Sequence, residues 1–152
     1  MTKVLKKKGV KVKRIDASQL LEAYLIREKV FVEEQKVPKE DEIDSFETTC
    51  HHYLAFDAEG KAVATARWRR TENGIKLERF AVLKEYRGQG IGSKLVEAVL
   101  ADVNSERISE NEPVYLHAQL EAVHLYEKFN FKKLGSKFDE CGIMHYKMVL
   151  KG

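Results

Sequence analysis

The segment EYRGQGIGSKLV, residues 85–96, places glycines at positions 88, 90 and 92 directly before a run of apolar residues at helical spacing. A glycine in the first turns of a helix destabilises it by about 1 kcal/mol relative to alanine. A bound anion offsets this cost, because free N–H groups point outward where a helix begins and missing Cβ atoms admit phosphate oxygens. Because Arg87 adds a guanidinium fork, the segment predicts a diphosphate-binding turn.

The spacing of the glycines separates this turn from two other phosphate-binding loops. A P-loop requires Gly-Lys-Ser/Thr, whereas Gly92 is followed by Ser93 and then Lys94. The dinucleotide fingerprint Gly-x-Gly-x-x-Gly, begun at Gly88, has Ser93 in place of its third glycine, and the segment from Pro113 onward has no acidic residue at a strand end ~20 positions later. A glycine-rich turn without a ligand is the alternative that remains.

Length and composition indicate one globular unit. The chain has 152 residues, enough for one domain with its own core, and we expect a single domain over residues 1–152. No apolar run reaches the ~20 residues of a membrane helix, and no apolar signal core follows the basic N-terminus. The only cysteines, Cys50 and Cys141, are too few for a disulfide framework, so a reducing cytoplasm is the expected location.

The sequence predicts no metal site. The Cys-His-His run at 50–52 lies on an expected strand, where adjacent side chains point to opposite faces. His117, His124 and Cys141 show no ligand spacing.

Charge is unevenly distributed, although the net charge is only +3. Residues 1–14 carry seven Lys or Arg and no acid, and residues 33–47 carry seven acids and two lysines. We interpret the basic end as a solvated arm or strand edge; nucleic-acid binding through residues 3–14, with a steep salt dependence, is the alternative. The acidic segment is interpreted as a solvated loop, with attraction of a cationic substrate as the alternative.

Alternation and helical spacing predict a mixed α/β sheet with helices packed against it, in the order β-α-β-β-β-α-β-α-β-β. The first helix begins at Asp16 or Ser18, Pro38 interrupts regular structure in the acidic segment, and Asn130 tolerates the left-handed conformation that ends the last helix. The expected strands are 10–15, 51–57, 61–70, 75–83, 113–118, 131–136 and 143–150, and the expected helices are 16–31, 91–105 and 120–129. Helical spacing groups Leu21, Tyr24, Leu25 and Glu28 in the first helix, and Ile91, Leu95, Val96, Val99, Leu100 and Val103 in the second.

Two motifs resemble a known family. Arg87-x-x-Gly90-x-Gly92, which follows the strand LERFAVL and opens a long helix, is similar to the Arg/Gln-x-x-Gly-x-Gly/Ala motif of the GCN5-related N-acetyltransferases (GNAT family), which cradles the pyrophosphate of acetyl-CoA. The segment LHAQLEAVHLYEKFNF, residues 116–131, resembles the second signature of that family, with Asn130-Phe131 in place of Gly-Phe and Gln119 in place of a frequent asparagine. The segments REKVFVEEQKVPKEDEIDSFE and FDECGIMHYKM further resemble the bacterial ElaA/YjcF-like acetyltransferases.

The resemblance implies a GNAT-like fold, with a central mixed, mostly antiparallel sheet and helices on both faces. It implies transfer of an acetyl group from acetyl-CoA, the cosubstrate, to a primary amine by direct attack in a ternary complex. Tyr126, which matches the tyrosine of the family's Leu-Tyr pair, is then the acid that protonates the departing thiolate, worth about 10²-fold because a thiol with a pKa near ~8.5 is already a fair leaving group. The implied cofactor-binding residues are Phe80, Ala81 and Val82 through their main chain, Arg87, Gly88, Gln89, Gly90, Ile91, Gly92 and Ser93 as the cradle, and Gln119.

A base is also needed, because an amine with a pKa near ~10 is mostly protonated at neutral pH. Glu78 lies where some members of the family hold a base, and alternation places it on one sheet face with Phe80 and Val82. The alternative is a surface carboxylate paired with Lys76 or Arg79. The rival candidates are His145, a residue type suited to proton transfer, and Glu140.

The acceptor side is expected to involve the acidic segment. Glu33, Glu34 and the acids from 40 to 44 would attract a cationic amine, while Arg67 would bind a substrate carboxylate. These features suit a small-molecule or peptide amine, with no nucleic acid and no membrane as partner. The competing function is a non-catalytic acyl-CoA-binding or regulatory module on the same fold, and a homodimer stays open.

Overall fold

In residues 9–151, which the computed structural model describes, seven strands form one sheet in the order β1-β2-β3-β4-β5-β7-β6. Neighbouring strands pair antiparallel except β4 and β5, which are parallel. The strands are β1 (Lys11–Ile15), β2 (His51–Phe56), β3 (Ala62–Thr71), β4 (Gly74–Val82), β5 (Val114–Gln119), β6 (Phe131–Glu140) and β7 (Ile143–Leu150). The expected element order is confirmed; residues 1–8 of the basic segment lie outside the described part of the chain.

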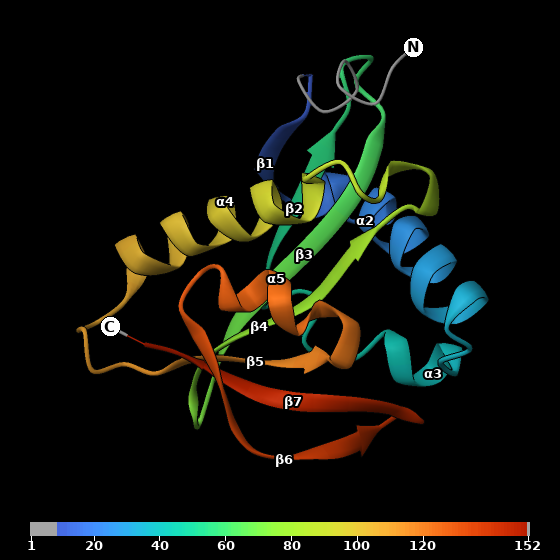
Figure 1. Cartoon of the computed structure of the whole chain (residues 1–152). Coiled ribbons are helices and arrows are strands. Elements are labelled where there is room, and N and C mark those ends of the chain that lie inside the picture. Colours follow the sequence, from blue (N-terminus) through green and yellow to red (C-terminus); the bar gives the residue numbers. More distant parts are fainter. Residues whose placement is uncertain (1–8, 152) are drawn as a thin grey trace.

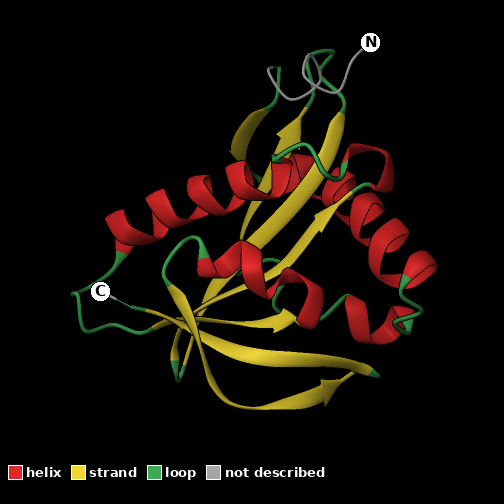
Figure 2. Cartoon of the chain, viewed as in Figure 1, coloured by secondary structure: helices red, strands yellow, loops and turns green. Residues whose placement is uncertain are grey.

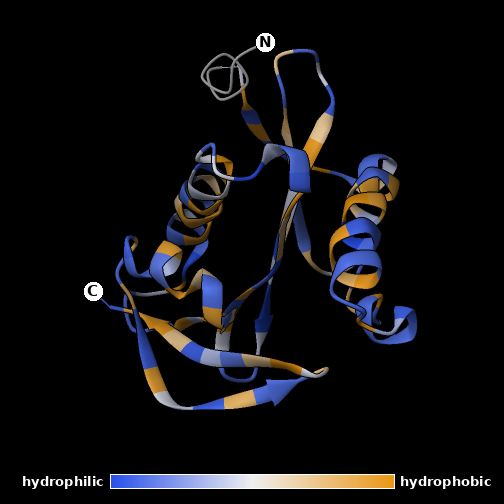
Figure 3. Cartoon of the chain, turned by 45° about the vertical axis from the view of Figure 1, so that its right-hand side comes forward, coloured by the Kyte–Doolittle hydropathy of each residue, from blue (hydrophilic) through white to orange (hydrophobic). Residues whose placement is uncertain are grey.

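Helices cover both faces of this sheet (Figure 1). α4 and α5 pack on one face and α2 on the other, as the ribbons of Figures 2 and 3 show. The helices are α2 (Leu20–Arg27), α3 (Lys39–Glu42), α4 (Ile91–Glu106) and α5 (Val123–Glu127). The short α3 was not expected: Pro38 immediately precedes it, where a missing N–H leaves no helical hydrogen bond unmade.

The spacing of apolar residues in α4 predicts its buried face correctly. The six residues expected on that face are the six that the helix buries against the sheet: Ile91, Leu95, Val96, Val99, Leu100 and Val103. Burial of such side chains contributes roughly 1.5–3 kcal/mol each relative to exposure.

The stripe expected for the first helix was wrong. The helix is capped as expected, since Asp16 Oδ1 accepts a hydrogen bond of 2.9 Å from the Ser18 amide, and it continues past α2 as a π-helical stretch, Glu28–Glu34. However, Leu21 and Leu25 are 67% and 54% exposed. The buried positions are Ala23, Ile26, Arg27 and Val30. A hydrophobic stripe cannot reveal a core-facing arginine, whose burial depends on carboxylates elsewhere in the chain.

The last hairpin differs from expectation only at its far end. β6 continues beyond residue 136, to Glu140. Its pairing with β7 is interrupted near Gly135, whose φ is +80°, and resumes at Phe138 with a shifted register. Asn130 adopts the expected left-handed conformation, with φ of +69°. The longer hairpin brings Glu140 and Cys141 to the rim of the cleft described next.

Candidate active site

β4 and β5 separate in the middle of the sheet. Their parallel pairing runs from Ile75 and Val114 to Leu77 and Leu116 and then ends, and Figure 1 shows the two strands diverging from that point. A cleft of about 350 Å³ lies between them, and residues of the acidic segment and of the β6–β7 hairpin also line it. The peptide groups from 80 to 82 therefore have no strand partner on the β5 side among the described residues.

A bulge in β4 decides which way its side chains point. The register against β3 shifts between Thr65 and Arg67, and Arg79 has a φ of +60°. Phe80 consequently packs with the core under α4 and α5, whereas Glu78 faces Arg67 on the other side of the sheet. The expectation that Glu78 shares a face with Phe80 and Val82 was wrong, because one extra residue in a strand reverses the alternation. Both Glu78 and Phe80 still line the cleft.

The glycine turn leads into α4 as expected. Gly88 and Gly90 have φ of +75° and +81°, which side chains with a Cβ rarely adopt. Gly92 has no such constraint, and a Cβ added there would meet only Leu125 Cδ2, at an ordinary 3.5 Å. No side chain caps the start of the helix. The positive φ angles thus explain the glycines at 88 and 90. Because Gly92 has no side chain, a ligand can approach the free N–H groups of the first helical turn.

Arg87 lies beside this turn with its guanidinium already bound. Its Nη atoms donate to both carboxylate oxygens of Glu34, at 2.8 and 2.9 Å, and its Nε donates to the Val82 carbonyl at 2.9 Å. Both partners of this ion pair are partly exposed. The guanidinium that the sequence predicts to bind phosphate is therefore bound to the Glu34 carboxylate. A phosphate would have to displace Glu34 from it.

The other expected cradle residues differ in what they can offer. Gln89 is only 5% exposed; its Nε2 donates to the Glu85 carbonyl, and its Oε1 has no partner among the described residues. The Ile91 side chain is in the core. Ser93 Oγ accepts from Lys128 Nζ at 3.2 Å. At Gln89 and Ile91, therefore, only the main chain is available to a ligand.

Tyr126 lies on α5 and lines the cleft. Its ring meets Phe80 edge-on at 5.8 Å between centroids and Phe131 at 6.0 Å. Burial raises the pKa of the Tyr126 phenol, so it stays protonated at neutral pH. Its hydroxyl has no hydrogen-bond partner in the described part of the chain, and it is available as a donor in the cleft.

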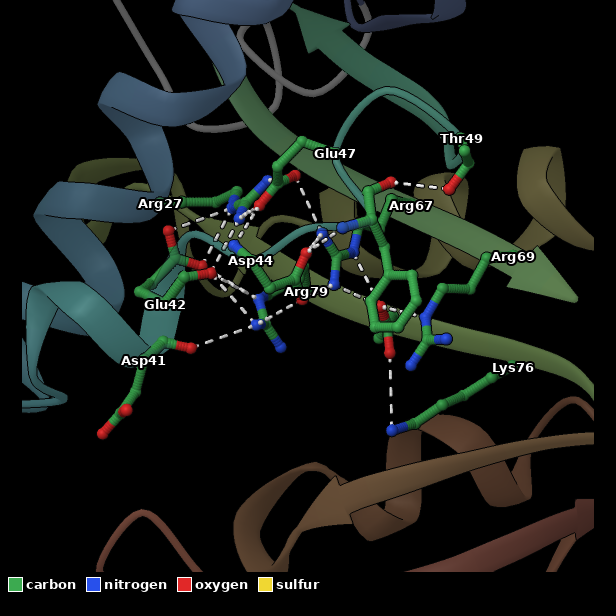
Figure 4. A network of polar contacts seen from close by, with 12 residues as sticks. Arg27, Asp41, Glu42, Asp44, Glu47, Thr49, Arg67, Arg69, Lys76 and Arg79 are labelled. Carbon is green, nitrogen blue, oxygen red and sulfur yellow. Dashed lines mark hydrogen bonds and ion pairs between the residues drawn. The ribbon is translucent and has the colours of Figure 1, made fainter. Parts of the chain in front are cut away.

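A buried ionic network joins α2, the acidic segment and β3 (Figure 4). Arg27 is 1% exposed, and its guanidinium binds the carboxylates of Glu42, at 2.9 Å, and Glu47, at 2.6 Å. Arg79 also binds Glu42, at 2.9 Å. These pairs hold the acidic segment against the sheet, so the segment is not the solvated loop that the sequence suggested.

Arg67 is part of this network and is not a substrate ligand. It is 1% exposed, and it binds Asp44 at 2.6 Å, Glu47 at 2.8 Å and Glu78. With every nitrogen of its guanidinium bound to a carboxylate, Arg67 has no donor left for a substrate. The sequence expectation was wrong because it placed Arg67 on a strand without knowing which acids lie across from it.

Glu78 is held by several cations. In addition to the ion pair with Arg67, the Glu78 carboxylate lies 3.1 Å from Arg69 Nε and 3.4 Å from Lys76 Nζ. Burial opposes ionisation of Glu78, but the charges of Arg67, Lys76 and Arg69 outweigh it and lower its pKa. The carboxylate is therefore ionised at neutral pH and a weak proton acceptor. The expected alternative, pairing with Lys76, is part of this arrangement.

His145 and Glu140 lie together on the opposite wall of the cleft. The Ile143 carbonyl accepts a hydrogen bond from His145 Nδ1 at 2.7 Å, so a neutral ring carries its lone pair on Nε2. Glu140 Oε2 lies 3.8 Å from that Nε2, and Glu140 Oε1 lies 3.1 Å from His117 Nδ1. The hydrogen bond from His117, outweighing burial, and the nearby charges of His117 and His145 lower the pKa of Glu140.

The remaining expected residues are divided between the cleft and the surface. Gln119 lines the cleft and exchanges two amide hydrogen bonds with Gln35, at 2.8 and 3.2 Å. Glu33 and Glu40 are exposed and lie outside the cleft lining, so they do not face a substrate there. Of the acidic segment, Asp41, Glu42 and Asp44 line the cleft.

No group of three or more His, Cys, Asp or Glu side chains within residues 9–151 is placed to hold a metal ion. None of the helices in that range is long and apolar enough to cross a membrane.

The sequence profile of the acetyltransferase (GNAT) domain matches residues 15–151. This chain belongs to the GNAT acetyltransferase family. It is accordingly an acyltransferase, and the expected membership of that family is confirmed. The uncharacterized N-acetyltransferase YjcF of Bacillus subtilis is 39% identical over 135 residues, which cover 86% of this chain and 91% of YjcF.

Solved structures show the same GNAT fold. Escherichia coli ElaA superposes with a TM-score of 0.82 at 26% identity, covering 93% of this chain and 99% of ElaA. An acyl-CoA N-acyltransferase from Pseudomonas aeruginosa superposes with a TM-score of 0.77 at 29% identity, covering 93% of this chain and 98% of that protein. The expected fold class and the likeness to ElaA/YjcF-like proteins are confirmed.

Several residues that shape the cleft of this GNAT-family protein were missed by sequence reasoning. Gln35, Arg69 and His117 line it, although sequence analysis assigned none of them a role in the site. His117 joins the site only through strand pairing. Alternation could have placed Arg69 on one face with Arg67, but the partner strands and their register were not known.

Proposed function

We propose that this chain transfers the acetyl group of acetyl-CoA to a primary amine by direct attack, while both substrates are bound. The observation that supports this most strongly is the cleft between β4 and β5. It presents the free Tyr126 hydroxyl from the α5 side, and Glu78, Glu140 and His145 from the opposite side. We also propose that one acetyltransferase domain spans residues 1–152.

The proposed acetyl-CoA site begins at the glycine turn. The N–H groups from 88 to 93 and the Arg87 guanidinium would hold the diphosphate once Glu34 is displaced. Gly92 packs near Leu125, the neighbour of Tyr126, so a chain leading from the turn along α5 reaches the cleft. There the peptide groups from 80 to 82, which have no strand partner on the β5 side among the described residues, would bind the pantetheine arm, and Gln119 would lie at the end of that arm.

The proposed reaction forms a C–N bond and breaks the C–S bond of the thioester. The amine nitrogen attacks the carbonyl carbon, and an N–H of β4 on the β5 side faces the developing oxyanion, an arrangement that can contribute roughly 3–4 kcal/mol. The amine gives up one proton to a base, and the CoA thiolate takes one from Tyr126. A proton returned from the base to Tyr126 restores the protein.

The geometry favours His145 as that base. Its Nδ1–H is fixed by the Ile143 carbonyl, which leaves Nε2 free to accept the amine proton, while the Glu140 carboxylate stabilises the imidazolium that forms. Glu78, the base first expected from the sequence, is already committed to three cations. We assign Glu78 the role of ordering those cations, and Glu140 that of a partner to His145.

We expect His145→Gln to lower kcat/KM for the amine by about 10²-fold, because general-base catalysis is lost, and Glu78→Gln to retain more activity. His124→Gln serves as the control, since His124 lies on α5 and its side chain is 95% exposed. Steady-state rates over a range of amine concentrations with acetyl-CoA saturating, together with the melting temperature of each variant, are the measurement. A loss confined to Glu78→Gln, with a fold as stable as that of the wild type, would make Glu78 the base.

We expect Tyr126→Phe to lower kcat by about 10²-fold, because the thiolate then leaves without a proton donor. The affinity for acetyl-CoA should not change, since the ring and its packing are kept. Release of free thiol from acetyl-CoA across a panel of primary amines measures this. Tyr146→Phe is a control that removes a hydroxyl packed against the same core but outside the cleft.

The same assay tests the proposed function itself. Acetyl-CoA binding without thiol release for any amine would favour the non-catalytic acyl-CoA-binding module. Release that is equal in Tyr126→Phe and in wild type would remove Tyr126 from the mechanism.

A further inference from the structure

A second hollow, here called the basic groove, adjoins the cleft. The groove is an open hollow of about 560 Å³ and shares the lining residues Arg69, Lys76 and His117 with the cleft. Its other cationic lining residues are Arg70 and Lys147. An acceptor whose amine enters the cleft can therefore extend into the groove.

Strand register gathers the charges of the basic groove. Arg69 lies opposite Lys76 in the β3–β4 pair, and Lys76 lies beside Tyr115 in the parallel β4–β5 pair. His117 lies opposite Lys147 in the β5–β7 pair. Paired residues point to the same face of a sheet, so these side chains form one continuous surface on the face opposite α4 and α5.

The cations of the groove are incompletely neutralised. Arg69 uses Nε for Glu78, and its guanidinium stacks on Phe46 at 3.9 Å, but its two Nη atoms have no partner in the described part of the chain. Lys76 shares the carboxylate of Glu78 with Arg69 and Arg67. Arg67 also binds Asp44 and Glu47, but Glu78 is the one acid paired with Arg69 and Lys76 among the described residues. Figure 4 shows these two cations at one end of the network.

Lys147 adds a further charge without an acid partner. Its Nζ lies 5.1 Å from the centroid of the Tyr115 ring, and no ion pair to it is found among residues 9–151. Arg70 is neutralised by Glu112, at 2.9 Å. The single acid in the groove lining is Glu72, so Arg69, Lys76 and Lys147 leave a surplus of positive charge. The half-buried cations repel one another until an anion lies between them.

We propose that the basic groove binds an oxyanion carried by the acceptor, so that the substrate is an amine with a carboxylate or phosphate group at a distance from its nitrogen. Arg69 provides two parallel N–H donors suited to either oxyanion, and Lys76 and Lys147 add point charges. Asp41 and Glu140, in the cleft, favour the cationic amine end. The two ends of the substrate are therefore oriented by opposite charges. This inference rests on the proposed function, and it gives Arg69 the role that the sequence had suggested for Arg67.

The test compares matched amines with acetyl-CoA saturating. ω-Amino acids with two to six methylenes and the corresponding ω-amino amides are nearly isosteric and differ in the charge at the far end, and the ω-aminoalkyl phosphonates place a tetrahedral oxyanion there. We expect kcat/KM to be at least about tenfold higher for one of the anionic series than for the amides, since charge-assisted hydrogen bonds are involved. A preference for carboxylates or for phosphonates identifies the oxyanion, and either preference supports the inference.

Lys147→Gln tests whether the basic groove causes the preference for an anionic amine. We expect it to reduce kcat/KM for the anionic amine about fivefold or more, with the amide unaffected, whereas a merely structural role would lower both. Lys133→Gln is the matched control, because Lys133 also lies over a tyrosine ring, that of Tyr146, at 4.7 Å but outside the groove. Equal loss for the acid and the amide would overturn the inference.

A binding measurement separates this inference from the proposed function. Calorimetric titration of each amine into protein saturated with CoA, which has no acetyl group to transfer, is expected to show tighter binding of the anionic amine than of its amide. Equal binding, or no binding of any anionic amine, overturns the inference whether or not turnover occurs. Anion-selective binding without turnover of any amine supports the groove and instead overturns the proposed transfer reaction.

Discussion

Gly90→Glu is expected to weaken acetyl-CoA binding by more than about 100-fold. The new side chain places a carboxylate and a Cβ at the start of α4, where the N–H groups and helix dipole would otherwise hold the diphosphate. Repulsion between like charges and loss of space act together. Calorimetric titration of acetyl-CoA into wild type and variant measures the change directly.

Gly60→Glu is a closely matched control. Gly60 has a φ of +83°, against +81° for Gly90, and a Cβ added there meets nothing within 4 Å, so both variants carry the same backbone strain. Gly60 lies in the turn between β2 and β3 and outside the cleft. Acetyl-CoA binding that survives in Gly90→Glu, or falls equally in Gly60→Glu, would contradict the assignment of the glycine turn. No binding to wild type would remove acetyl-CoA as the cosubstrate.

Arg67→Met is expected to reduce the free energy of unfolding by about 3–5 kcal/mol, the usual result of removing one partner from a buried ionic network. Three acids, Asp44, Glu47 and Glu78, would lose a partner at once. Urea unfolding followed by circular dichroism at pH 7 gives the value. Arg70→Met is the control: its pair with Glu112 is partly exposed, and such pairs are worth about 1 kcal/mol or less.

The loss in free energy of unfolding caused by Arg67→Met should also depend on pH. Burial opposes the ionisation of Asp44. The hydrogen bond from Arg67 and the positive charge of Arg67 outweigh burial and lower the pKa of Asp44 from 3.8 to about 2. A carboxyl whose pKa is lowered in the folded state stabilises the protein above its unfolded pKa, and that contribution is lost as the pH falls toward its folded pKa. The difference between wild type and Arg67→Met should therefore be largest at neutral pH and shrink between about pH 4 and 2. A difference that stays constant over this range would contradict the electrostatic explanation.

The sequence was sufficient for most of the fold because local patterns agree with tertiary burial there. Most of the strands show alternation or a buried apolar run, although β6 is exposed over most of its length, and α4 buries the face that its spacing predicts. The first helix departs from its pattern. Its most apolar stripe, with Leu21 and Leu25, faces solvent, while Arg27 is buried by partners 15 and 20 residues away.

In the candidate site, too, features that lie in one short segment could be predicted and features assembled from several strands could not. The glycine turn and Tyr126 could be named from the sequence because the chemistry proposed for each resides in a short continuous motif, and Gly90→Glu and Tyr126→Phe test those proposed roles. The basic groove could not be predicted, since it combines Arg69, Lys76 and Lys147 from three strands. The role of Glu78 also changed, because its cations come from β3 as well as from its own strand.

By itself, the sequence determined the elements, the position of the glycine turn and the family, because periodicity and motif spacing are properties of neighbouring residues. Only the tertiary structure decided where β4 and β5 part, which face Glu78 points to and which arginine is left with free donors. A single bulge at Arg79 sets the face of Glu78, and the position of the bulge depends on pairing with another strand. The distribution of carboxylates among Arg67, Arg69 and Lys76 then follows from distances in space, which no local pattern encodes.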